Sequence, residues 1–390
     1  MMSNNYENYR FETRLIHTGE PRDDENGSVV PAIYQSSTYL YPGKYGGKPK
    51  YVRNVNTPNQ TIVCEKIASL EGTEAGLVTA SGMAAISTAL LGLVKRGEHL
   101  LAQDDLYGGT FQFLKDVFPE MGRAVTLFPL GRGADLKEFL RPNTKAIYVE
   151  SVSNPLMKIP DLSGIAQFGK TQGLISFIDN TFPSPFNFNP ARFGFDVVLH
   201  SATKYLNGHS DIMGGAILTS EKHVETISHL LRELGGALDP HSAYLLNRGM
   251  KTLSVRMRWQ NESALKIAQA LSGHPDIVAL HYPGLQGHSD HARAKEWFRG
   301  FGGVFSLLYK GDGPKTMKFV NALKLPFVAP SLGGVESLVT LPVITSHRGL
   351  SPMEQQARGI TESLVRVSVG LEDPDDLIED FLNALEKARA

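Results

Sequence analysis

Short apolar runs that alternate with helix-like stretches are the feature of this sequence that most limits its fold. Strands that alternate with helices form a mostly parallel sheet with helices on both faces, an α/β fold. Ligands of such sheets bind beyond the carboxyl ends of the strands, so the residues after each run are the informative ones. The predicted strands cover residues 77–80, 100–102, 125–128, 146–149, 175–178 and 197–199.

The patterns along the 390 residues predict three parts. Residues 1–60 have no lasting helical period and are predicted as an irregular arm, whose tyrosines favour packing on another subunit over disorder. Residues 61–255 contain the predicted sheet. Residues 256–390 mix shorter strands and helices, which predicts a smaller α+β domain. We expect one long helix over residues 240–271.

Composition and isolated residues exclude several functions. The net charge of −1 argues against a nucleic-acid-binding surface, and 42% hydrophobic residues argue against disorder. Cys64 is the one cysteine, so no disulfide can form within the chain. The polar N-terminus and the lack of a long apolar run predict a cytoplasmic protein without a membrane partner. His281, His288 and His291 lie in a loop without metal-ligand spacing, so we expect no metal site.

A lysine follows directly after the last predicted strand of the sheet. An ammonium group loses hydration near a buried strand, so Lys204 indicates a use for its amine. It can hold a phosphate, or it can form a Schiff base with an aldehyde such as pyridoxal phosphate (PLP). A solvated loop lysine is the alternative interpretation.

Two further strand ends carry groups that fit one ligand. Asp179 ends a predicted strand 25 residues before Lys204, and a buried carboxylate needs a cation, either a protonated pyridine nitrogen or an arginine. Residues 81–83 begin a predicted helix, where free backbone N–H groups attract anions, although a simple helix cap would look the same. No lysine follows Gly82 as in a phosphate-binding P-loop, and the chain has no GxGxxG motif.

The residues around Lys204 resemble the lysine motif of the Cys/Met-metabolism (transsulfuration) family of PLP-dependent enzymes. The resemblance implies a PLP-dependent transferase fold of type I (aspartate aminotransferase-like), with a PLP-binding domain at 61–255 and a C-terminal domain at 256–390. It also implies a homotetramer of two active dimers, in which the arm of residues 1–60 contacts a neighbouring subunit. Family blocks lie at 13–19, 81–85, 179–181, 201–205, 208–211, 214–215, 248–253, 331–334 and 366–372.

The resemblance also implies roles for individual residues. Lys204 would bind PLP and move protons between substrate carbons, and it is predicted as catalytic together with Tyr107 and Tyr51. Asp179 would pair with the ring nitrogen, and Tyr107 would stack on the ring. The phosphate would be held by Gly82, Met83, Ser201 and Thr203, and by Tyr51 and Arg53 of the neighbouring subunit. The substrate would be bound by Arg366, which clamps its α-carboxylate, with Asn154 and Ser331 assisting.

Departures from the family pattern bear on the substrate. Gly109 stands where methionine γ-lyases typically have cysteine, and Pro330 stands where many bacterial γ-synthases and γ-lyases have glutamate. The loop at 54–60 is one residue longer than usual. We expect an enzyme of the cystathionine γ-synthase or γ-lyase type, which removes or replaces the γ substituent of a homoserine-derived or cystathionine-like amino acid. The alternatives are a cystathionine β-lyase, a methionine γ-lyase, a Schiff-base enzyme without PLP and a non-catalytic PLP-binding protein.

Overall fold

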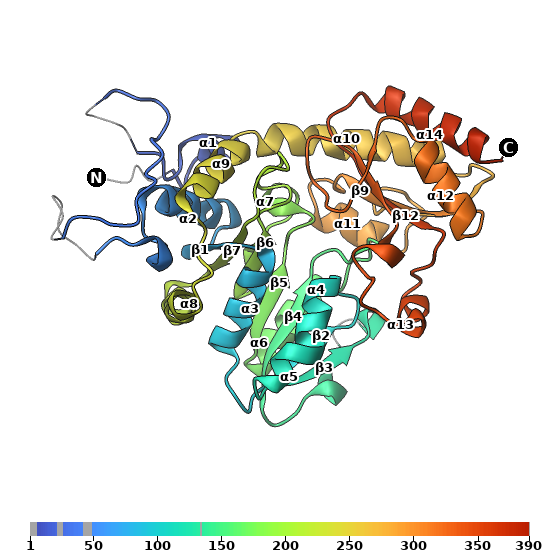
Figure 1. The fold of residues 1–390 in the computed structure, drawn as a ribbon. Helices are drawn as coiled ribbons and strands as arrows, with labels where there is room; N and C mark the ends of the chain where they lie inside the picture. Colours follow the sequence, from blue (N-terminus) through green and yellow to red (C-terminus); the bar gives the residue numbers. More distant parts are fainter. Residues whose placement is uncertain (1–5, 22–25, 42–48, 133–134, 390) are drawn as a thin grey trace.

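Two β-sheets organise the computed structural model, which describes residues 6–21, 26–41, 49–132 and 135–389 (Figure 1). The larger sheet has seven strands in the order β1-β7-β6-β5-β4-β2-β3, and the smaller has five in the order β10-β11-β12-β9-β8. Buried apolar side chains form two clusters: one surrounds the larger sheet, and the other fills the space around the smaller sheet.

The larger sheet confirms the predicted mostly parallel arrangement. Neighbours from β3 to β6 are parallel, whereas β7 is antiparallel to both β6 and β1. Strand β7 was not among the predicted strands. Gly215 begins this strand at a point where a Cβ would collide with the carbonyl of Ser81. The strands are β1 (Ala75–Thr79), β2 (His99–Gln103), β3 (Ala124–Phe128), β4 (Thr144–Glu150), β5 (Ile175–Asp179), β6 (Val197–Ser201) and β7 (Gly215–Thr219).

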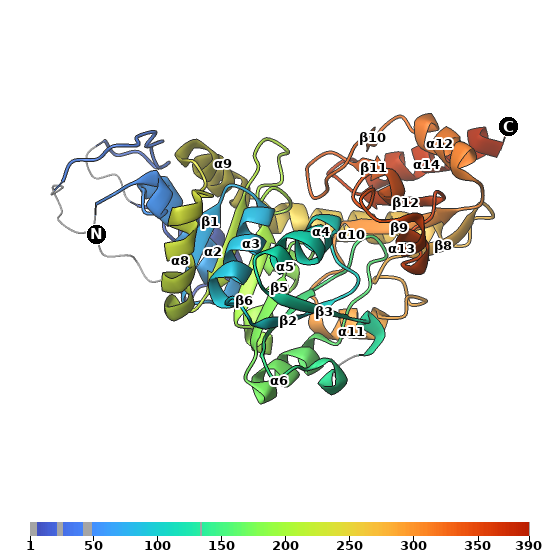
Figure 2. The same ribbon diagram turned by 60° about the horizontal axis from the view of Figure 1, so that its bottom comes forward.

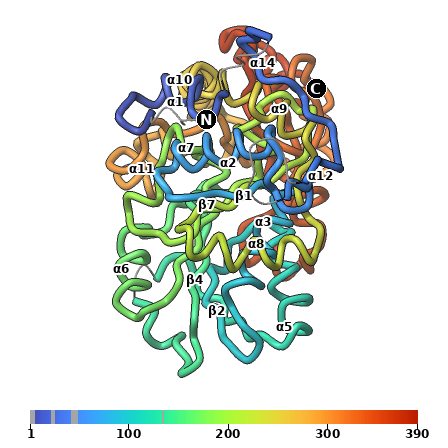
Figure 3. The backbone as a smooth tube through the Cα atoms, turned by 90° about the vertical axis from the view of Figure 1, so that its left-hand side faces the viewer, coloured from blue at the N-terminus to red at the C-terminus, as the bar shows by residue number. Residues whose placement is uncertain are grey.

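Helices cover both faces of the larger sheet. Figure 3 shows α2 and α9 on one side of β1 and β7, with α3 and α8 on the other. Helix α2 begins where Thr57 and Gln60 form a capping box. The helices are α2 (Pro58–Glu71), α3 (Gly82–Leu93), α4 (Gly108–Gln112), α5 (Phe118–Glu120), α6 (Leu162–Gln172), α7 (Ser184–Asn187), α8 (Glu221–Leu234) and α9 (Pro240–Met250). Single turns lie at η2 (Phe113–Val117), η3 (Leu130–Arg132), η4 (Lys137–Phe139) and η5 (Pro190–Phe193).

The smaller sheet and its helices lie beside the carboxyl edge of the larger sheet (Figure 2). Helices α10 and α12 each pack against α14 beside this sheet. The strands are β8 (Ile277–His281), β9 (Val304–Tyr309), β10 (Phe327–Val328), β11 (Leu338–Thr340) and β12 (Leu364–Ser368). The helices are α10 (Leu253–Leu271), α11 (His291–Trp297), α12 (Gly313–Ala322), α13 (Pro352–Ala357) and α14 (Pro374–Arg389), with one turn at η6 (Pro342–Ile344).

The long helix expected over 240–271 is wrong, because the chain breaks into α9 and α10. The break falls at Lys251 and Thr252, just after Gly249 packs against the backbone of Asn207. A side chain at Gly249 would collide with the carbonyl of Asn207, so α9 approaches the segment after Lys204 by backbone contact. Hydrophobic spacing does not reveal such a contact.

The arm is partly regular, which corrects the prediction of an irregular segment. It contains α1 (Phe11–His17), held by its buried Phe11 and Leu15, and a turn at η1 (Val52–Asn54). Three of its stretches, residues 1–5, 22–25 and 42–48, lie outside the described residues. Its middle part presents apolar side chains to the exterior: Val29 is 92% exposed and Leu40 is 90% exposed.

Candidate active site

Lys204 lies in the turn after β6, with its amine half-buried. The Nζ atom donates a hydrogen bond of 2.7 Å to Oγ of Ser331, a residue that the sequence places 127 positions away. Burial, and then the guanidinium of Arg366, lower the pKa of Lys204 to about 8. A larger fraction of this amine is therefore neutral and nucleophilic near neutral pH than of a solvated lysine.

Asp179 ends β5, the strand next to the one that leads to Lys204. Its Oδ1 accepts hydrogen bonds from the backbone N–H of Thr181 at 2.9 Å and from the hydroxyl of Thr181 at 2.5 Å. The same hydroxyl oxygen accepts from the backbone N–H of Ser201 at 2.8 Å. Burial raises the pKa of Asp179, while the hydrogen bonds from Thr181 oppose that shift. A carboxylate in this position is stabilised by a cationic partner, such as a protonated ring nitrogen.

The start of α3 lies directly against the residues that precede Lys204. Ser81 caps this helix, since its Oγ accepts from the N–H of Ala84 at 3.0 Å. A Cβ on Gly82 would come within 2.8 Å of the Cβ of Ser201, so the glycine allows the two segments to approach. The hydroxyl of Thr203 accepts from the N–H of Gly214 at 3.0 Å. The first N–H groups of α3 and these hydroxyls together form a cradle suited to a phosphate.

Arg366 on β12 connects the smaller sheet to this site. Its Nη1 donates to Oδ1 of Asn154 at 3.2 Å, and its Nη2 donates to the carbonyl of Ser331 at 2.7 Å. The side chain is 4% exposed, and its Nε has no hydrogen-bond partner among the described residues. Burial lowers the pKa of Arg366 to about 10. A buried guanidinium N–H without a partner is costly, and a carboxylate is the group that satisfies it best.

Tyr107 and Met83 meet at Gly109. A Cβ on Gly109 would come within 2.6 Å of the Tyr107 ring and within 3.1 Å of the Met83 sulfur. The Tyr107 side chain is 43% exposed, so its ring is accessible for stacking. Its backbone N–H donates at 2.7 Å to Oε1 of Glu150, which ends β4. Burial, and then the neighbouring Asp179, raise the pKa of Glu150 well above its usual range.

Tyr51 and Arg53 contact each other and α8 in this chain. Arg53 stacks over the Tyr51 ring at 5.5 Å, and its Nη1 donates to the carbonyl of Arg232 at the end of α8. The structure brings together the predicted phosphate and substrate residues of the strand ends and β12. The interactions that Tyr51 and Arg53 make are with each other, with Asn56 and with Arg232. Their role toward a neighbouring subunit stays a prediction.

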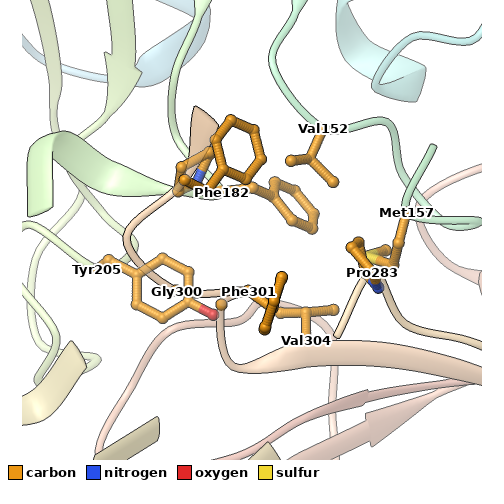
Figure 4. A pocket seen from close by; sticks show the side chains of 11 residues that line it. Val152, Met157, Phe182, Tyr205, Pro283, Gly300, Phe301 and Val304 are labelled. Atoms are coloured by element: carbon orange, nitrogen blue, oxygen red, sulfur yellow. The ribbon is translucent and has the colours of Figure 1, made fainter. Parts of the chain in front are cut away.

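The side chain of Tyr205, next to Lys204, is held by a hydrogen bond and by apolar packing. Its hydroxyl accepts from the N–H of Gly303 at 3.2 Å, and its ring lines an apolar cavity of about 10 Å³ with Phe182 and Val304 (Figure 4). That volume holds at most about one water molecule, so the cavity is no ligand site. Arg256 binds the same turn, since its guanidinium donates to the carbonyls of Tyr205 and Leu206.

Several residues of the site were missed by the sequence analysis. Thr181 and Glu150 directly follow predicted strands or their ends, but the sequence analysis gave them no role. Arg256 is 52 positions from Lys204, and its three carbonyl partners are invisible to any side-chain motif. Cys64 is buried, and burial raises the pKa of its thiol to about 12, so it packs in the core.

Comparison with known proteins identifies the family. The family described as Cys/Met metabolism PLP-dependent enzyme matches residues 12–386. The chain belongs to this family. It is 41% identical to the cystathionine gamma-lyase of Bacillus subtilis over 96% of this chain and 99% of that one, and 38% identical to the cystathionine beta-lyase of Coxiella burnetii over 99% and 100%.

The fold agrees with that assignment. A crystal structure of cystathionine gamma synthase from Xanthomonas oryzae pv. oryzae, in complex with aminoacrylate and cysteine, superimposes with a TM-score of 0.94. The two sequences are 34% identical, and the superposition covers 97% of this chain and 98% of the other. The protein therefore has the type I fold of PLP-dependent enzymes, as the sequence resemblance implied.

PLP is the cofactor of this family, and the residues present fit it. Lys204 offers an amine of lowered pKa, Asp179 offers a buried carboxylate for the ring nitrogen, and the approach at Gly82 leaves a cradle for the phosphate. In the part of the chain that the structure describes, no three His, Cys, Asp or Glu side chains are grouped as metal ligands. No described helix combines the length and apolarity needed to cross a membrane.

Proposed function

We propose that this protein is a transsulfuration enzyme of the cystathionine γ-synthase or γ-lyase type. It would eliminate or replace the γ substituent of a homoserine-derived or cystathionine-like amino acid. The observation that carries the proposal is the position of Ser331, whose hydroxyl meets the amine of Lys204 and whose carbonyl meets the guanidinium of Arg366. An α-amino acid held at Arg366 has its α-carbon beside a reactive amine.

Arg366 orients the substrate and Lys204 moves protons. The unpartnered Nε of Arg366 binds the α-carboxylate, while Asn154 holds the guanidinium in place. Bound PLP draws electrons from the α-carbon of the substrate, which makes its C–H bond acidic. The neutral amine of Lys204 takes that proton and delivers protons to the carbons further along the side chain. Tyr107 would stack on the cofactor ring, and Asp179 would pair with the ring nitrogen.

The arm completes the site in the proposed assembly. Tyr51 and Arg53 reach the phosphate of a neighbouring subunit. The exposed apolar residues of the arm then pack on that neighbour. We propose a homotetramer of two active dimers in the cytoplasm, with the arm at 1–60, the PLP domain at 61–255 and the C-terminal domain at 256–390.

The second candidate is a cystathionine β-lyase. It is favoured by the 38% identity to the Coxiella burnetii enzyme of that name, which is close to the 41% identity to the Bacillus subtilis gamma-lyase. Both reactions begin with loss of the same α-proton, so Lys204, Asp179 and Arg366 serve either one. The position of the broken C–S bond distinguishes them.

Product identification tests the proposal. The holoenzyme is incubated with cystathionine, with methionine, and with O-succinylhomoserine plus cysteine, and the 2-oxo acid or amino-acid product is identified. 2-Oxobutanoate from cystathionine, or cystathionine from the third mixture, supports the γ-type reaction. Pyruvate as the main product from cystathionine would establish the β-lyase instead. Lys204→Ala is expected to abolish each reaction and the yellow absorption, whereas Lys222→Ala, an exposed lysine of α8, is expected to leave both.

A further inference from the structure

Two buried polar side chains of α10 face the segments that form the site. Arg256 is 2% exposed and Gln260 is 0% exposed. The two residues are four positions apart, about one helical turn, so their side chains project from the same face of α10. Burying such groups is costly unless they form hydrogen bonds, so their partners indicate what this face of the helix holds.

Arg256 binds the turn that carries Lys204. Its guanidinium donates to the carbonyls of Tyr205 at 2.9 Å and Leu206 at 3.5 Å, the two residues after Lys204. The guanidinium also fills the space beside Gly208, where a Cβ would lie 2.0 Å from Nη1 of Arg256. The turn is therefore shaped around this side chain.

Gln260 binds the segments that follow Ser331 and Arg366. Its Nε2 donates to the carbonyl of Gly334 at 2.8 Å and to the carbonyl of Val369 at 3.1 Å. Gly334 is three residues after Ser331, and Val369 is three residues after Arg366. Because Oε1 of Gln260 has no partner in the described part of the chain, this side chain acts through its N–H donors.

The two sets of partners also contact each other. The hydroxyl of Tyr205 accepts from the N–H of Gly303 at 3.2 Å, and the carbonyl of Gly303 accepts from the N–H of Val369 at 2.7 Å. A Cβ on Gly333 would lie 2.9 Å from the backbone nitrogen of Tyr205. The turn after β6 thus meets residues 331–334 by close backbone approach, and α10 binds both segments.

We propose that Arg256 and Gln260 are positioning residues, which together set the distance between the amine of Lys204 and the guanidinium of Arg366. The inference rests on the proposed roles of Lys204 and Arg366. It extends them, because it assigns the spacing of these two groups to one helix that takes no part in the proposed chemistry.

This spacing matters because one substrate contacts both groups. In the proposed reaction, the guanidinium of Arg366 binds the α-carboxylate while the amine of Lys204 takes the proton of the α-carbon. These two parts of the substrate are joined by a single bond, so the substrate cannot adapt to a changed distance. A misplacement of about 1 Å can cost about 100-fold in rate.

The kinetic test uses two variants of α10. Gln260→Met keeps the length of the side chain but removes its N–H donors, and Arg256→Lys keeps the charge but not the planar fork. Each holoenzyme is mixed in a stopped-flow instrument with saturating cystathionine or O-succinylhomoserine, whichever the product test shows to be converted. The first-order rate constant of the change in the yellow absorption should fall about 10- to 100-fold. Loss of folded protein alone does not change that constant.

Hydrogen exchange of the holoenzymes, measured by mass spectrometry, gives a readout apart from activity. In Gln260→Met, the amides of residues 331–336 and 366–371 should exchange about tenfold faster, and in Arg256→Lys those of residues 204–208. The matched control is Ile267→Ala on the same helix. Ile267 is 0% exposed and packs in the apolar cluster of the smaller sheet. This control should lower the Tm without changing the rate constant or selectively speeding exchange in these segments.

Several results would overturn the inference. An unchanged rate constant in Gln260→Met and Arg256→Lys would do so, and so would an equal fall in Ile267→Ala. A lower rate constant without faster exchange in the named segments would also contradict it. If the unmodified protein converts none of the tested substrates, the proposed function fails. Faster exchange in the named segments then still supports their attachment to α10, and unchanged exchange refutes it.

Discussion

The amine of Lys204 sits among groups that disfavour its charge. It has no carboxylate partner among the described residues and is held by the hydroxyl of Ser331, with the cation of Arg366 nearby. A lysine in such surroundings gives up its proton at lower pH than a solvated one. The site therefore holds a nucleophile before the cofactor arrives.

Cofactor loading should follow this titration. Because the pKa of Lys204 is lowered from its ordinary value to about 8, the rate at which apoprotein acquires the visible band should rise with pH up to about 8 and then level off. The rate is measured by stopped-flow absorbance between pH 6 and 10. A rate that keeps rising about tenfold per pH unit to pH 10 would show an amine of ordinary pKa.

Arg366→Lys separates charge from geometry. Lysine keeps the positive charge but cannot replace the planar contacts to Asn154, Ser331 and a carboxylate. We expect the KM for the amino-acid substrate to rise about 10- to 100-fold, from the loss of about 1.5–3 kcal/mol. The kcat should fall less. Steady-state kinetics of variant and unmodified protein check this, and an unchanged KM would exclude Arg366 as the carboxylate clamp.

The residues of the site differ in how readily the sequence alone identifies them. Lys204, Asp179 and Arg366 stand in recognisable blocks with a chemical reason for their type. The contact between His200 and Glu71 has no such motif, because the two residues are 129 positions apart. Pairings of this kind depend on the packing of α2 on the sheet, and no local pattern encodes that.

At the level of elements, apolar runs predicted the strands of the parallel sheet well. The apolar runs did not predict the elements whose position depends on close contact between backbone segments. Strand β7 begins with Gly215, which approaches the backbone of Ser81 because it has no side chain, and no strand was predicted there. One amphipathic pattern runs through both α9 and α10. The two helices are separated just after Gly249, which contacts the backbone of Asn207.

Gly249→Ala tests that backbone contact. The added methyl group would meet the carbonyl of Asn207, in the segment that follows Lys204. Overpacking of this kind costs about 1–3 kcal/mol, so we expect a Tm several degrees lower and faster loss of cofactor on dialysis. Gly287→Ala is the control, since a Cβ there meets nothing within 4 Å. Equal Tm values for the two variants would contradict the prediction.

For the whole molecule, the middle of the arm is notable because it exposes large apolar side chains such as Val29 and Leu40. Asp in place of Leu40 should weaken association, because a charge would be buried at the proposed interface. We expect light scattering to give a mass near four times 42.7 kDa for the unmodified protein and a smaller mass for Leu40→Asp. Met353→Asp, at an exposed methionine of α13, should leave the mass unchanged. A monomeric unmodified protein would refute the assembly.

The proposed contact of Tyr51 and Arg53 with the phosphate of a neighbouring subunit can be tested by intersubunit complementation. The Lys204→Ala variant keeps Arg53, and the Arg53→Ala variant keeps Lys204. Every site of either homodimer therefore lacks one of these two residues. When the two variants are unfolded and refolded together, about half of the dimers are mixed, and each mixed dimer holds one complete site. Activity should return to about a quarter of the unmodified level. If the mixture stays as inactive as its parents, each chain supplies its own phosphate ligands.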